Sequence, residues 1–161
     1  MKYLLHFTSL IIFLLVTGNA VAGQTNQRTG VAPEGVFDHS TVEEAWKSAI
    51  AKKRPLLVMF TSENCTFCRK MIADTYSHRG VQQMLRGRTE SVMAHSDDYA
   101  GLIKKLGIRG YPSSLLISPE GEVLDFMEGY VDAKSFADRV GPLLDRPAER
   151  IGMVEEPKFA N

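Results

Sequence analysis

The spacing of apolar residues along the chain changes character between residues 40 and 60. Up to residue 53, apolar side chains recur every three or four positions, as they do along one face of a helix. Ser40 and Glu43 have the spacing of a capping box at the start of this helix. Pro55 ends the helical pattern. The continuous apolar run Leu56–Phe60 that follows predicts a central strand buried on both faces.

The remaining pattern predicts a second helix from Cys65, with Phe67, Met71, Ile72 and Tyr76 on its buried side. Further elements follow in order: a short turn at 81–85, a weaker strand at 91–95, a helix over 99–106 that ends at Gly107, a hairpin of strands 113–117 and 122–126, and a last helix from Asp132 to 144. Early strands alternate with helices and a hairpin follows. This order predicts an α/β fold with a mixed central sheet and flanking helices.

The two ends of the chain differ from this folded part. Residues 1–22 combine Lys2, a largely apolar segment and the small residues of Ala20-Val21-Ala22, which predicts a signal peptide cleaved after Ala22. The alternative is an uncleaved membrane anchor, although polar residues dilute the segment. Residues 23–40 are predicted to be a flexible lead-in, 41–145 one domain, and 146–161 a loosely held tail.

Composition and charge do not indicate a function, so the function must be inferred from local sequence motifs. The chain has 161 residues, 44% of them apolar, and a formal net charge of zero. These values are typical of a globular protein, and they give no basic field for binding nucleic acid. Export would place the protein where disulfides persist. Its two cysteines, Cys65 and Cys68, close too short a loop to stabilise the fold much. A bond between them is better explained as one that opens and closes.

A cysteine pair between a strand and a helix has a specific chemistry. The first turn of a helix has unpaired amide hydrogens and the positive end of the helix dipole, both of which favour a thiolate. Arg69 and Lys70 add positive charge, while Glu63 would oppose it. Cys65 is therefore predicted to attack a partner disulfide, and Cys68, one helical turn later, to resolve the mixed disulfide.

These motifs carry a resemblance to a known family. The strand 56–60, the segment Cys65-Thr66-Phe67-Cys68-Arg69-Lys70-Met71 and the segment Gly107-Ile108-Arg109-Gly110-Tyr111-Pro112 closely resemble the thioredoxin superfamily, over about residues 42–144. Within it, the chain is similar to periplasmic thioredoxin-like domains, including the C-terminal domain of the membrane thiol reductase DsbD. The segment 129–136 supports this nearer likeness.

The resemblance implies a thioredoxin fold and a substrate-binding surface. It implies that the Tyr111–Pro112 bond is cis and that the backbone before Pro112 pairs with the substrate chain. Thr66 and Phe67, between the cysteines, belong to the same predicted surface. The implied partners are protein thiol or disulfide substrates and a second redox protein, for which a membrane thiol reductase is the candidate. No cofactor beyond the Cys65–Cys68 disulfide is expected, and a monomer is expected.

One departure from the family bears on proton transfer. Members commonly carry a buried acid six positions before the first cysteine, where this chain has Met59. Met59 cannot accept a proton and is interpreted as a core residue, so water, Glu63 or another acid must handle the proton of Cys68. The dipeptide between the cysteines also lacks the histidine that the resemblance links to strong oxidants. This absence favours a reductant or thiol carrier.

Two other functions are compatible with the sequence. The cysteines and two of His39, His78 and His95 could hold zinc, although the histidines lack paired spacing. The fold could instead serve as a binding module without redox turnover, because a fold does not determine a function. Insulin reduction with dithiothreitol, or equilibration with glutathione, separates a binding module from an oxidoreductase.

Overall fold

A four-stranded mixed sheet forms the centre of the protein in the computed structural model, which describes residues 33 and 35–145. The strands are β1 (Leu56–Thr61), β2 (Glu90–His95), β3 (Ser113–Ile117) and β4 (Val123–Glu128), in the spatial order β2-β1-β3-β4. β1 runs parallel to β2 and antiparallel to β3, and β3 and β4 form the hairpin. The mixed α/β sheet predicted from the sequence is confirmed.

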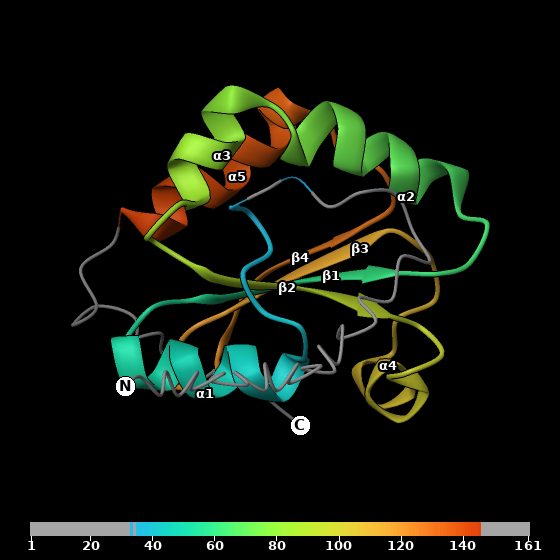
Figure 1. The fold of residues 1–161 in the computed structure, drawn as a ribbon, viewed down its shortest axis with the longest axis horizontal. Coiled ribbons are helices and arrows are strands. Elements are labelled where there is room, and N and C mark those ends of the chain that lie inside the picture. Colours follow the sequence, from blue (N-terminus) through green and yellow to red (C-terminus); the bar gives the residue numbers. More distant parts are fainter. Residues whose placement is uncertain (1–32, 34, 146–161) are drawn as a thin grey trace, which may run out of the picture.

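Helices cover both faces of this sheet (Figure 1). On one face lie α1 (Val42–Lys52) and α4 (Ala100–Leu106); on the other lie α2 (Thr66–Met71), the π-helix η1 (Ile72–Tyr76), α3 (Arg79–Leu85) and α5 (Ala133–Leu144). The short turn predicted at 81–85 is therefore the end of a helix. Gly107 ends α4 with a φ of 70°, a left-handed conformation that glycine adopts without strain.

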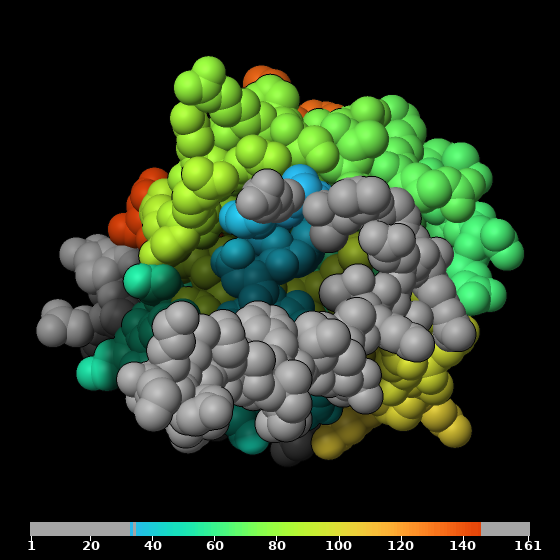
Figure 2. Space-filling view, in the orientation of Figure 1, coloured from blue at the N-terminus to red at the C-terminus, as the bar shows by residue number. Residues whose placement is uncertain are grey.

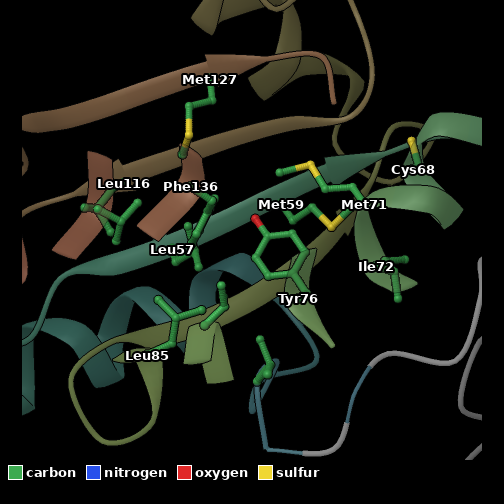
Figure 3. Packing of buried hydrophobic residues seen from close by; sticks show 13 residues of the cluster. Leu57, Met59, Cys68, Met71, Ile72, Tyr76, Leu85, Leu116, Met127 and Phe136 are labelled. Carbon is green, nitrogen blue, oxygen red and sulfur yellow. The ribbon is translucent and has the colours of Figure 1, made fainter. Parts of the chain in front are cut away.

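The core consists of two apolar clusters, one on each face of the sheet. Leu57 and Met59 belong to the cluster beneath η1 and α5, whereas Val58 and Phe60 belong to the cluster against α1 and α4. Figure 3 shows the first cluster, with Met59 lying between the strands and the helix that carries Cys68. All six residues of β1 are buried, as expected for a strand covered on both sides.

Two local predictions differ from the structure. Phe67 is 60% exposed, whereas Met71, Ile72 and Tyr76 are buried as predicted. Because one residue turns a helix by about 100°, Phe67 points away when Cys68 and Met71 face the sheet. The second difference concerns the start of α1, and it amounts to one residue.

Thr41, rather than Ser40, caps helix α1. The Glu44 amide donates a hydrogen bond to Thr41 Oγ1 over 3.1 Å, and the Glu44 carboxylate accepts one from the Ser40 amide over 3.4 Å. The capping box is therefore displaced by one position from the predicted pair Ser40 and Glu43. Both pairs have the same spacing, and the side chain nearer the first helical amides makes the bond.

The end of the predicted flexible lead-in is packed against the domain. Val36 is 2% exposed and belongs to the apolar cluster beneath α5, and the Phe37 ring meets the Tyr76 ring edge-on at 4.9 Å. The amides of Asp38 and His39 both donate to the Ser91 carbonyl. In Figure 2 this blue segment crosses the sheet edge between the helix layers.

The signal peptide predicted at 1–22, most of the lead-in and the tail 146–161 lie outside the described residues. No helix within the described part is long and apolar enough to cross a membrane.

Candidate redox site

The cysteine pair lies where β1 ends and α2 begins. The loop 62–64 connects them, and Asn64 adopts a φ of 56°, a left-handed conformation that asparagine tolerates better than most residues. Cys65 occupies the N-cap of α2 with extended backbone angles. The chain therefore turns sharply after the buried strand and presents Cys65 at the end of the sheet.

The two sulfurs form a disulfide, with an S–S distance of 2.06 Å. The Cys68 amide donates to Cys65 Sγ over 3.0 Å. Cys65 is partly exposed, whereas Cys68 is fully buried. The pair thus has one sulfur accessible to a partner and one sheltered beneath it, and the accessible sulfur already receives a backbone hydrogen bond.

The positively charged side chains beside the cysteine pair, Arg69 and Lys70, have other interaction partners in the structure. Lys70 forms an ion pair with Asp74 and lies 4.7 Å from the centre of the Tyr130 ring. The hydrogen bond to Asp74 raises the pKa of Lys70, and the same bond lowers the pKa of Asp74. Arg69 donates to Thr66 Oγ1 over 3.3 Å. Because the charge of Lys70 is paired, it contributes less to a thiolate at Cys65 than an isolated lysine would.

The loop before β3 lies at the same end of the sheet. Phe60 is paired with Ser113, so the end of β1 that leads to Cys65 is next to the residue that follows Pro112. The Tyr111–Pro112 bond is cis. Pro112 is buried, while Tyr111 is half-buried and packs, like Cys65, against the cluster that contains Cys68.

The loop after β4 joins this proline loop to the redox helix, a connection that the sequence analysis missed. The Gly129 amide donates to the Pro112 carbonyl over 2.7 Å. Two residues later the Val131 carbonyl accepts from Thr75 Oγ1 over 2.5 Å, and Tyr130 Oη donates to Asp74 over 3.3 Å. Helix propensity and apolar spacing carry no signal for the contacts of Val131 and Tyr130, because each joins residues 56 positions apart in the chain.

The position of the family's buried acid is apolar here. Met59 is fully buried in the same cluster as Cys68. Its partner on β3 is Ser114, whose Oγ lies 2.8 Å from Tyr76 Oη. Burial raises the pKa of Tyr76, so this hydroxyl stays protonated at all ordinary pH values. Glu63, which the sequence left open as a proton acceptor, has an exposed side chain.

The three histidines considered for zinc have separate surroundings. His39 Nε2 lies 2.8 Å from Glu90, and exposed His78 accepts a hydrogen bond from the Gly80 amide at the start of α3. His95 lies at the end of β2, where its Nδ1 faces Asp97. In the part of the chain that the structure describes, no three histidine, cysteine or acidic residues are grouped as metal ligands.

Sequence comparison gives a family match and a curated relative. The model of the thioredoxin-like domain family matches residues 42–141, more than half of the chain. The thiol:disulfide interchange protein DsbD of Ralstonia nicotianae is 28% identical over 105 residues. That match covers 63% of this chain but only 17% of the relative, so the chain corresponds to a small part of that protein.

Solved structures show the same fold. A thioredoxin from Thermus thermophilus matches with a TM-score of 0.65 at 22% identity, over 73% of this chain and 93% of its own. The DsbH oxidoreductase matches with a TM-score of 0.60 at 16% identity, over 73% and 92%. The reduced C-terminal domain of DsbD from Neisseria meningitidis matches with a TM-score of 0.52 at 20% identity, over 60% and 88%. At these identities the likeness concerns the fold alone.

Proposed function

We propose that this chain, which belongs to the family of thioredoxin-like domains, is a thiol–disulfide oxidoreductase. It would act on protein partners through Cys65 and Cys68. The observation that carries this proposal is the asymmetry of the pair. Cys65 is partly exposed, and its Sγ accepts a hydrogen bond from the Cys68 amide, whereas Cys68 is fully buried. A hydrogen bond from an amide stabilises a thiolate more than a thiol, so Cys65 is suited to attack.

The proposed reaction makes and breaks bonds only at sulfur atoms. The Cys65 thiolate attacks a disulfide of the partner, and the partner's first sulfur leaves with a bonding electron pair. Cys68 then attacks Cys65 Sγ, which releases the partner's second sulfur and forms the Cys65–Cys68 disulfide. Two electrons pass to the partner, and a second dithiol protein returns the pair to the reduced state.

The proposed substrate surface surrounds Cys65. Thr66 and Phe67 are exposed beside it, and half-buried Tyr111 with Pro112 lies at the same end of the sheet. An extended substrate segment would pair with the backbone before Pro112 and place its sulfur at Cys65. Side-chain contacts with Phe67 and Tyr111 would then add affinity.

We further propose that the protein is exported, works in the reducing direction and acts as a monomer. Export rests on the predicted signal peptide 1–22, and the direction on the neutral dipeptide Thr66-Phe67 between the cysteines. The membrane thiol reductase suggested by the family likeness is a candidate electron donor.

Two measurements test the function. The protein is expected to catalyse insulin reduction by dithiothreitol and to equilibrate with glutathione at a defined potential. Cys68→Ser should retain partners from the native compartment on Cys65 as mixed disulfides, whereas Cys65→Ser should retain none. A protein that shows neither turnover nor a defined potential is a binding module instead.

A further inference from the structure

Glu128 is an exposed carboxylate at the margin of the candidate substrate surface. It is the last residue of β4 and is paired with Ser113, the residue that follows Pro112. The next amide along the chain, that of Gly129, donates to the Pro112 carbonyl over 2.7 Å. These contacts hold the end of β4 against the proline loop, so the side chain of Glu128 begins at a fixed position beside that loop.

The Glu128 side chain lies against the backbone of the proline loop. Gly110 is two positions before Pro112, and a Cβ atom placed on it would lie 3.1 Å from Glu128 Oε1 and 3.6 Å from Glu128 Cγ. A glycine at this position therefore leaves the space that the carboxylate occupies. The negative charge is thereby placed directly over the segment that leads to Tyr111.

The same loop keeps backbone groups available for an incoming chain. Ser113 Oγ donates to the Gly110 carbonyl over 2.8 Å, which fixes the loop on one side of Tyr111, and the bond from Gly129 to Pro112 fixes it on the other. Within the described residues, no hydrogen bond is made to the backbone of Tyr111. An extended segment that pairs there advances about 3.3 Å per residue, so its neighbouring residues would lie beside Gly110 and Glu128.

The carboxylate of Glu128 has no cation of its own in the described part of the chain. The segment 123–132 contains two other acidic side chains, and both are engaged. Asp125 forms an ion pair with Arg139, and Asp132 accepts hydrogen bonds from two amides at the start of α5. Neither a hydrogen bond nor an ion pair with another described residue engages the Glu128 side chain. Its charge is therefore available to a binding partner.

We propose that Glu128 makes the protein select substrates that carry a lysine or an arginine beside the reactive cysteine. This inference rests on the proposed redox function and deepens it, because it names the charge of the preferred substrate segment. An unpaired carboxylate attracts a basic side chain and repels an acidic one, which changes the choice of partner and the rate of association. Glu128 is thus a specificity-determining residue, and the exchange at the sulfur atoms is the one already described.

Two other exposed charges lie close to the site in the sequence. Glu63, in the loop before Cys65, has the same sign as Glu128 and would act in the same direction. Arg109 directly precedes Gly110 and would instead favour an acidic substrate segment. Substrates of both charges are therefore needed in the test, together with variants of Glu128 itself.

The expected effect is modest, because the ion pair with the substrate would form at the protein surface. Exposed pairs of this kind change a binding or rate constant by about threefold. They are also screened by salt, since the screening length falls from about 10 Å at 0.1 M to about 3 Å at 1 M. Salt dependence therefore distinguishes a charge effect from a contact of another kind.

The test compares three peptide disulfides that are identical except for lysine, glutamine or glutamate next to the cysteine. The rate at which the reduced protein reduces each peptide is measured at low salt and divided by the rate with dithiothreitol, which corrects for the reactivity of the peptide disulfide itself. We expect the corrected rate to be about threefold higher for the lysine peptide than for the glutamine peptide, and about threefold lower for the glutamate peptide.

Variants assign the preference to one side chain. Glu128→Gln should make the three corrected rates nearly equal, and Glu128→Lys should reverse their order. Glu122→Gln removes an exposed carboxylate just before the other end of β4 and should keep the order of the wild type. In about 1 M salt the wild-type protein should lose its preference.

The same ratios of corrected rates in the wild type and in Glu128→Gln would overturn the proposal, as would faster reduction of the glutamate peptide by the wild type. If the Glu128 variants do not fold, the wild type decides alone, and a preference that persists in about 1 M salt contradicts the role of the charge. A failure of the proposed function looks different: the wild-type protein would then reduce none of the three peptides and no insulin.

Discussion

The aromatic side chain of Phe67, which lies between the two cysteines in the sequence, is exposed. Phe67 is 60% exposed, an unusual position for a side chain that could contribute to a core. If a substrate covers this ring, Phe67→Ala should raise KM for a protein substrate about fivefold, since burying half of such a side chain yields on the order of 1 kcal/mol. Steady-state insulin reduction measures this effect, and the potential against glutathione should not change.

A matched control distinguishes a substrate contact at Phe67 from a general effect of removing an exposed apolar side chain. Val123 on β4 is 59% exposed and is not part of the candidate site. Val123→Ala should leave KM unchanged. Equal effects of the two substitutions would argue against a substrate contact at Phe67.

Single residues also show how far the sequence predicts the candidate site. The spacing of Cys65 and Cys68 between a strand and a helix was sufficient to place the pair. The environment of Cys68 was not predictable from Met59 alone, because Leu116, Met127 and Phe136, which pack in the same cluster, lie far from it in the chain. Which strand residues share that face follows only from the register, since a shift of one residue would move every side chain of a strand to the other side.

At the scale of elements, the start of α1 provides a direct test of local structure. Thr41→Ala removes the side-chain oxygen that caps the Glu44 amide and should cost about 1 kcal/mol of stability. Ser40→Ala should cost much less, because no hydrogen bond of the Ser40 side chain contributes to the cap. Urea unfolding of both variants measures the difference, and a larger loss for Ser40→Ala would restore the cap predicted from the sequence.

The order of elements was predictable, whereas the irregular part of the redox helix was not. Apolar spacing distinguishes strands from helices well, since burial on one or both faces sets it. The π-helical turn η1 has no comparable pattern. It is stabilised by contacts such as Thr75 with Val131, which form only once the loop after β4 is in place.

At the scale of the whole molecule, Glu90 joins three parts of the fold. Its carboxylate accepts from Ser48 and Lys52 of α1 and from Arg54, and it lies 2.8 Å from His39 Nε2. Burial by itself would raise the pKa of Glu90, but the hydrogen bonds from His39, Lys52 and Ser48 outweigh it and lower the pKa to about 2. The ionised carboxylate therefore stabilises the folded state.

This stabilisation has a defined pH window. It is complete above the ordinary pKa of 4.5 and is lost as the pH falls from there toward about 2. Glu90→Gln should lower the free energy of unfolding at neutral pH by on the order of 3 kcal/mol, and the difference from wild type should shrink in acid. Urea unfolding between neutral pH and about pH 3 measures both. A constant difference across this range would contradict the role of the charge, and Glu120→Gln in the exposed turn is the control.

The segment that holds His39 has a consequence for how copies of the protein meet. Because the amides of Asp38 and His39 both bond to Ser91 and His39 pairs with Val92, the outer margin of β2 is occupied by the chain itself. A strand of another molecule could pair with β2 there only after displacing this segment. At the other edge of the sheet, the Arg139 side chain donates a hydrogen bond to the Phe126 carbonyl of β4. Both edges of the described sheet are thus partly closed to strand-by-strand stacking into fibrils, a protection that matters if the protein binds extended substrate chains as proposed.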